Sequence, residues 1–263
     1  MIISGDLTET LMPRLLKTVI PRFTRSLKER GIAGTLLRSP LIPISLVREY
    51  ILAKRLERTP EHSEFDRKYG VNTDGEFSGW TYLSDLDIPS PNWIYGRNYA
   101  GIEPERFFAI FDDLAIRFEE FTFIDFGSGK GRALLMASEF PFKKIVGIEF
   151  SPQLNAIAQQ NIERYSSPTQ QCRQIETVQM DFAQYFLPPE PLVLFFYDPC
   201  EARVLEQVLA NLRASWQKTP RPIYLIYVAP AEEWILQSSG FLAKSAQNAQ
   251  LNFCVYSSLR EAS

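Results

Sequence analysis

The sequence is poor in the residues that most metal sites and histidine-dependent enzymes require. His62 is the only histidine among the 263 residues, so a histidine-based metal cluster is excluded and a Ser-His-Asp or Cys-His site has a single candidate imidazole. The cysteines Cys172, Cys200 and Cys254 stand apart without CxxC spacing, which disfavours a zinc site and a disulfide framework. We expect no bound metal, a reducing compartment and a surface role for His62.

Long hydrophobic runs are also missing. No stretch approaches the roughly 18 uninterrupted apolar residues that cross a bilayer. The first ten residues carry Asp6 and Glu9 where a signal or transit peptide would carry basic residues. The sequence therefore predicts a cytoplasmic protein without a transmembrane segment.

The net charge of −3 is divided unevenly along the chain. Residues 1–58 hold 11 Lys/Arg and 5 Asp/Glu, whereas the remainder carries −9. Apolar residues recur at three- and four-residue steps over Leu11–Leu27 and again from Ile44 to Leu56, which predicts a basic amphipathic helical extension over residues 1–60. Such helices bind an anionic surface or a partner protein, or cap the following domain with their apolar stripe.

Residues 61–102 have a different character. Glycines and aromatics alternate there without a sustained period, which predicts a long ordered loop region that serves as a lid or shapes a substrate site. Tyr95 and Tyr99 are the lid candidates. Pro104 then begins a helix whose buried side is expected to run from Phe107 to Phe118.

Residues 103–263 are predicted to form an α/β domain. Beyond Phe121, short apolar runs alternate with helical segments, which indicates a doubly wound, mostly parallel sheet. The runs lie at 121–126, 144–150, 177–182, 192–197 and 223–229. Two last runs, at 241–246 and 251–259, are too close together to enclose a helix, so we expect a C-terminal antiparallel hairpin that completes seven strands. Ser151 is expected to cap a helix, and Gly240 to end one.

A glycine-rich segment lies where the first of these strands ends and a helix begins. It reads Asp125-Phe126-Gly127-Ser128-Gly129-Lys130-Gly131, and its glycines allow a ligand to approach the backbone closely. The spacing is not that of a phosphate-binding P-loop, and the third glycine comes one residue too early for a dinucleotide fingerprint, which disfavours a nicotinamide-dependent oxidoreductase. An acid two positions before the first glycine suits a ligand that carries a cationic amine.

This segment resembles the first motif of the class I S-adenosyl-L-methionine-dependent methyltransferases, a strand followed by D/E-x-G-x-G-x-G. The resemblance extends over residues 121–259 and implies a Rossmann-like fold. It also implies that Glu149, at the end of the second strand, holds the ribose hydroxyls and that Asp181, after the third, meets the adenine amino group. Phe150 and Met180 are expected to contact adenine or to pack in the core. The full set of expected cofactor-binding residues is Asp125, Phe126, Gly127, Ser128, Gly129, Gly131, Glu149, Phe150, Met180, Asp181 and Tyr99.

The fourth strand ends in Asp198-Pro199-Cys200, where amino-directed methyltransferases often carry Asn/Asp-Pro-Pro-aromatic. Asp198 is the candidate for orienting the nucleophile or accepting its proton. The departure at Cys200 and Glu201 weakens the case for a methyltransferase that acts on adenine or cytosine amino groups of nucleic acid. The sequence looks more similar to the small non-SET protein-lysine methyltransferases, so we favour a protein amino group as the methyl acceptor. Two alternatives remain: a covalent cytosine-C5 mechanism on Cys200, and a cofactor-binding or inactive scaffold that acts through its basic N-terminal helices.

Overall fold

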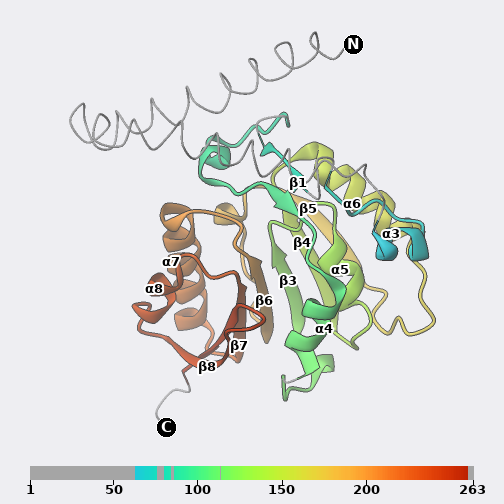
Figure 1. The fold of residues 1–263 in the computed structure, drawn as a ribbon. Helices are drawn as coiled ribbons and strands as arrows, with labels where there is room; N and C mark the ends of the chain where they lie inside the picture. The colour runs from blue at the N-terminus through green and yellow to red at the C-terminus, as the bar shows by residue number, and fades with distance from the viewer. Residues whose placement is uncertain (1–62, 76–79, 84–85, 113, 260–263) are drawn as a thin grey trace, which may run out of the picture.

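The computed structural model describes four stretches of the chain (Figure 1), namely residues 63–75, 80–83, 86–112 and 114–259. The helices expected within residues 1–60, and His62, lie outside these stretches. Within them, no helix is both long enough and apolar enough to cross a membrane.

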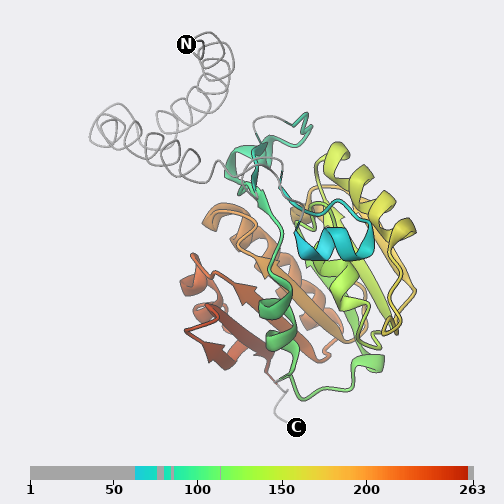
Figure 2. The ribbon, with the colours of Figure 1, turned by 45° about the vertical axis from the view of Figure 1, so that its right-hand side comes forward.

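One sheet of seven strands forms the centre of the described structure, which confirms the predicted α/β fold (Figures 1 and 2). In order across the sheet, the strands are β5 (Ile175–Gln179), β4 (Lys144–Glu149), β3 (Thr122–Phe126), β6 (Leu192–Tyr197), β7 (Ile223–Val228), β9 (Phe253–Ser258) and β8 (Leu242–Asn248). The first five are parallel, and β9 and β8 form the predicted antiparallel hairpin. The strand order reverses between β3 and β6, and open α/β sheets bind ligands at the carboxyl ends of the strands at such a point.

Helices cover both faces of this sheet (Figure 2). The helices on one face are α4 (Pro104–Asp112), α5 (Arg132–Ala137) and α6 (Pro152–Arg164), and those on the other are α7 (Ala202–Lys218) and α8 (Glu233–Gln237). Along β3, Phe123 belongs to the core beneath α4 and α5, whereas Ile124 and Phe126 belong to the core beneath α7. Burial on both faces explains why the central strands are almost wholly apolar.

The ends of several elements follow the predicted signals. Ser151 caps α6 by accepting a hydrogen bond at Oγ from the Leu154 amide at 3.3 Å, with Pro152 in the first turn. Gly240 is left-handed, with φ 73°, but it does not cap the helix as predicted, because α8 ends at Gln237 and its C-cap is Ser238. The helix that begins at Pro104 was predicted to extend to Phe118, but α4 ends at Asp112. Phe118 nevertheless packs against the same core from a short 3-10 helix, η3 (Phe118–Glu120).

The glycine- and aromatic-rich segment is mostly irregular, but it contains short elements. These are α3 (Glu64–Tyr69), β1 (Trp80–Thr81), the 3-10 helix η2 (Pro91–Tyr95) and β2 (Tyr99–Ala100). β1 and β2 pair with each other in antiparallel register, apart from the central sheet. The described parts of this segment therefore follow a defined path that can shape a site.

Candidate active site

The glycine loop between β3 and α5 turns sharply at the carboxyl end of the sheet. Gly127, Gly129 and Gly131 all have positive φ, at 86°, 54° and 85°, a conformation that side chains with a Cβ rarely adopt. A Cβ on Gly129 would lie 2.1 Å from carbons of the Tyr99 ring, so this ring rests directly on the loop. Gly131 approaches Ala158 of α6, where a Cβ would lie 3.2 Å from the alanine Cβ. The first two positions shape the ligand side, and the third allows close helix packing.

Glu149 joins this loop to the end of β4. Its carboxylate accepts hydrogen bonds from the Gly129 amide and from the Ser151 amide, both at 2.8 Å, and the side chain is 2% exposed. A carboxylate has about four acceptor positions, so acceptor capacity remains for a ligand. Glu149 therefore both orders the glycine loop and presents oxygen atoms to the site.

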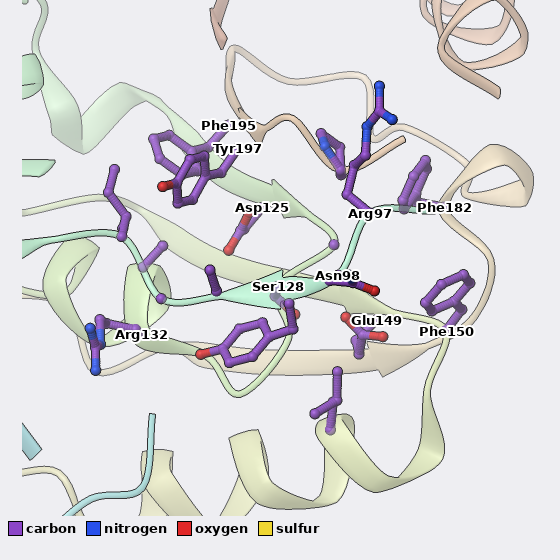
Figure 3. Close-up of a pocket in the computed structure, with 18 of the residues that line it drawn as sticks. Arg97, Asn98, Asp125, Ser128, Arg132, Glu149, Phe150, Phe182, Phe195 and Tyr197 are labelled. Atoms are coloured by element: carbon purple, nitrogen blue, oxygen red, sulfur yellow. The ribbon is translucent and has the colours of Figure 1, made fainter. Parts of the chain in front are cut away.

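A pocket lies over this loop, and residues 97–102 form part of its wall (Figure 3). Six of the expected cofactor-binding residues line it: Asp125, Gly127, Ser128, Glu149, Phe150 and Tyr99. Figure 3 shows the Asp125 and Glu149 carboxyl groups and the segment that carries Asn98 gathered around one space. Phe150 and Phe182 lie at the same end of the pocket, where two aromatic rings suit a planar ligand.

The other expected cofactor-binding residues have packing roles in the described structure. The Phe126 ring stacks on Phe196 with centroids 4.7 Å apart and is 2% exposed. Met180 packs against the same core. Gly129 and Gly131 shape the loop without lining the pocket. The side chains of Phe126 and Met180 therefore contact the hydrophobic core.

Asp181 anchors the aromatic-rich segment. Its Oδ2 accepts hydrogen bonds from Ser90 Oγ at 2.6 Å and from Asn92 Nδ2 at 2.7 Å, while Oδ1 accepts one from the Ala183 amide at 2.9 Å. Ser90 also caps η2. Sequence reasoning missed Ser90 and Asn92, because nothing in their local pattern shows that they lie beside residue 181. Contact between Asp181 and an adenine amino group stays a prediction.

Asp198 lies beside the pocket but does not line it. Its Oδ1 accepts a hydrogen bond from the Tyr227 hydroxyl at 3.1 Å, and its Oδ2 is 3.3 Å from Arg97 Nε. Its φ of 36° is unusual for a non-glycine residue. The residues on both sides of it, Tyr197 and Pro199, do line the pocket. The side chain is thus held at the rim by two partners that the sequence did not predict.

The amino-terminal end of the described chain is fixed to the glycine loop by buried polar groups. Arg132, at the start of α5, donates a hydrogen bond from Nε to Thr73 Oγ1 at 2.6 Å and forms ion pairs with Asp66 and Asp74. The Tyr99 hydroxyl donates to the Thr73 carbonyl at 2.6 Å. Arg132 was not among the expected site residues, although a charged residue at the first turn of a buried helix is a signal for a buried ion pair.

The two buried carboxyl groups of the pocket titrate far from their ordinary range. Burial raises the pKa of Asp125 to about 8, and the nearby Glu149 carboxyl adds to this increase. Burial also raises the pKa of Glu149 to about 7, although backbone N–H groups of Ser151, Gly129 and Phe150 oppose the change. Among the described residues, no cation forms an ion pair with either group. The pocket is therefore suited to a ligand that brings positive charge.

Cys200 does not have the features of a nucleophile. It is 2% exposed, and burial raises the pKa of its thiol, with Asp198 adding to the increase. A reactive cysteine needs a lowered pKa and access to substrate. The covalent alternative therefore has no support from this geometry.

Comparisons with known proteins give similarity in fold only. No family model matches the sequence, and no curated protein matches it closely. A solved structure described as a methyltransferase from Pseudomonas syringae is 14% identical with a TM-score of 0.46, over 59% of this chain and 97% of that one. A precorrin-6y C5,15-methyltransferase from Geobacter metallireducens is 14% identical with a TM-score of 0.40, over 60% and 88%. Similarities at this level assign neither substrate nor cofactor to this chain.

Proposed function

We propose that this chain is an S-adenosylmethionine-dependent methyltransferase. The observation that carries the proposal is the pair of buried carboxyl groups, Asp125 and Glu149, that face one pocket beside a left-handed glycine loop at the point where the strand order reverses. Two buried acids that have no ion-pair partner among the described residues fit a ligand with a cationic amine and a pair of hydroxyl groups. A pyrophosphate would be repelled by the same acids.

Each part of the cofactor has a matching group in the pocket. Asp125 would pair with the ammonium, directly or through water, and Glu149 would accept hydrogen bonds from the ribose hydroxyls with the acceptor capacity left beside its two amide donors. Phe150 and Phe182 would contact the two faces or edges of adenine. The glycine loop leaves space for the methionine end close to the backbone.

The cofactor supplies a methyl group on a sulfonium, which is a good leaving group. The chain then has to align the acceptor and exclude water, since proximity and orientation supply most of the rate enhancement in such a displacement. The residues 97–102 that wall the pocket serve that exclusion. Asp198, at the rim, would orient the attacking atom or accept its proton.

We further propose that the acceptor is a protein amino group. Among the described residues, Asp198, Glu201 and Glu232 all contact Arg97 at the pocket rim, so carboxylates gather there. Residues 59–263 together carry −9, and a nucleic-acid phosphate backbone would be repelled by this surface. An amine gains from the same charges.

Isothermal titration with S-adenosylmethionine and S-adenosylhomocysteine tests the cofactor assignment, with NAD(H) as the negative control. We expect binding of both adenosyl compounds and none of NAD(H). No heat with either adenosyl compound would favour the inactive scaffold. Incubation of the protein with methyl-tritiated cofactor in a cell extract, followed by separation of protein, nucleic acid and small molecules, then identifies the acceptor class.

Asp125→Asn should weaken cofactor binding and make it less dependent on pH. Binding needs an ionised Asp125, whose pKa in the free protein is about 8, and a protonated cofactor amine, which loses its proton at about 8. Wild-type affinity should therefore rise by up to about tenfold per pH unit from pH 6 and reach a maximum near pH 8. The variant should bind about tenfold more weakly at pH 8 and show a much shallower rise, as measured by titration calorimetry.

The ligand-free protein provides the control for this prediction. The folded-state pKa of Asp125 lies above the ordinary value of 3.8, so its contribution to stability is present below that value and is lost as the pH rises through about 8. Asp125→Asn should remove this loss, and its melting temperature should fall less than that of the wild type between pH 6 and 8. An unchanged melting profile together with wild-type affinity at pH 8 would refute the role of Asp125.

A further inference from the structure

Arg97 joins the aromatic-rich segment to the loop that follows β6. Its amide donates a hydrogen bond to the Pro199 carbonyl at 3.0 Å, and the neighbouring Gly96 forms an antiparallel bridge with Cys200. The Glu201 amide donates to the Tyr95 carbonyl at 2.8 Å. The backbone of Arg97 is therefore fixed beside Asp198 independently of its side chain.

The Arg97 side chain meets carboxylates from two separate loops. Nε is 3.3 Å from Asp198 Oδ2, Nη1 is 3.9 Å from Glu201 Oε1 and Nη2 is 3.7 Å from Glu232 Oε1. Asp198 and Glu201 follow β6, whereas Glu232 precedes α8. Three carboxylates around one guanidinium would repel one another without it.

We infer that Arg97 is a positioning residue, the counter-ion that fixes the Asp198 carboxylate at the rim of the pocket. This inference deepens the proposed function and rests on it, because Asp198 is the residue proposed to meet the acceptor. Arg97 is among the residues that line the pocket, and Asp198 lies directly beside them. The Tyr227 hydroxyl donates a hydrogen bond to the other carboxylate oxygen, so the ion pair and this bond act on different oxygens of Asp198.

The charge of Arg97 affects the pKa of the Asp198 carboxyl group, and this effect can be measured. Burial raises the pKa of Asp198, and the Arg97 charge is the largest influence that lowers it; the Tyr227 hydroxyl lowers it further and Glu232 raises it. Among the described residues, Asp198 also interacts with the titratable groups of Tyr197 and Cys200. Without Arg97, burial and Glu232 still raise the pKa of Asp198, and the largest influence that lowers it is lost. The protonated form of Asp198 then becomes more favourable.

The test is a titration of Asp198 by 13C NMR on protein labelled at the aspartate carboxyl carbon, with the resonance assigned through Asp198→Asn. In Arg97→Gln the midpoint should be higher than in wild type by roughly one pH unit, and in Arg97→Lys it should lie between the two. Arg203→Gln is the matched control, because Arg203 contacts Tyr95 of the same segment at 3.0 Å and is not one of the main influences on the pKa of Asp198. Its midpoint should equal that of wild type.

Equal midpoints in wild type and Arg97→Gln, or an equal change in Arg203→Gln, would overturn the inference. Arg97 is 37% exposed, so the substitution should leave the fold intact, as circular dichroism would check. Glu232→Gln provides a second test in the opposite direction, since loss of a like charge should lower the midpoint. These titrations need no cofactor. A wild type that binds no S-adenosylhomocysteine would refute the proposed function, while the midpoints would still decide the role of Arg97.

Discussion

Gly129→Ala should weaken S-adenosylhomocysteine binding on the order of 100-fold or more, which corresponds to about 2.7 kcal/mol. The new Cβ would lie 2.1 Å from two carbons of the Tyr99 ring, so the ring has to leave the glycine loop. The Tyr99 hydroxyl bond to Thr73 and the Gly129 amide bond to Glu149 would both be disturbed. One substitution thus displaces a pocket wall and a carboxylate that faces the ligand. Titration calorimetry measures the loss.

Gly240→Ala is the matched control for this substitution. Gly240 has φ 73°, close to the 54° of Gly129, but a Cβ there meets nothing within 4 Å. It should cost about 1–2 kcal/mol of stability from left-handed strain and leave binding unchanged. If both variants bound equally well, crowding by Tyr99 would have no part in the site. Tyr99→Ala in the Gly129→Ala background should recover part of the binding, because it removes the clash while the strain remains.

Asp198→Ala should lower the turnover of methyl transfer by about 100-fold while S-adenosylhomocysteine affinity stays within about twofold of wild type. Asp198 lies at the pocket rim outside the lining residues, so an interaction with the acceptor or the transition state is lost and adenosine contacts remain. Labelling of the acceptor in a cell extract measures the turnover, and calorimetry measures the affinity. A loss of cofactor affinity would instead place Asp198 in the cofactor pocket, and the acceptor site would then be sought among residues 61–102.

Cys200→Ser separates this mechanism from covalent catalysis. The buried, unreactive thiol of Cys200 predicts that the serine variant keeps most of the labelling activity. An inactive serine variant together with a trapped substrate adduct would support the cytosine-C5 alternative in place of the proposed displacement.

Spacing alone was enough to predict the sheet and the glycine loop. Strands buried on both faces produce continuous apolar runs, and the short connection between the last two runs permits only a hairpin. Both patterns depend on residues that are close together in the sequence, so the sequence alone reveals them. The glycines at positions 127, 129 and 131 were also readable, because positive φ favours glycine through sterics within the residue itself. Asp125 followed from its place two residues before the first glycine, whereas Glu149 was implied by the resemblance to the class I methyltransferases.

The tertiary structure decided what the remaining polar residues contact. Asp181 binds Ser90 and Asn92, and Asp198 binds Arg97 and Tyr227, across separations from 29 to 101 residues along the chain. These partners come from a segment without a hydrophobic period or from another strand, so no local pattern marks them. A carboxylate at a strand end is chemically suited to a ligand amine, a hydroxyl or an arginine alike. Only the tertiary structure, which places Ser90, Asn92 and Arg97 beside the strand ends and Tyr227 beside Asp198, determines which of them it meets.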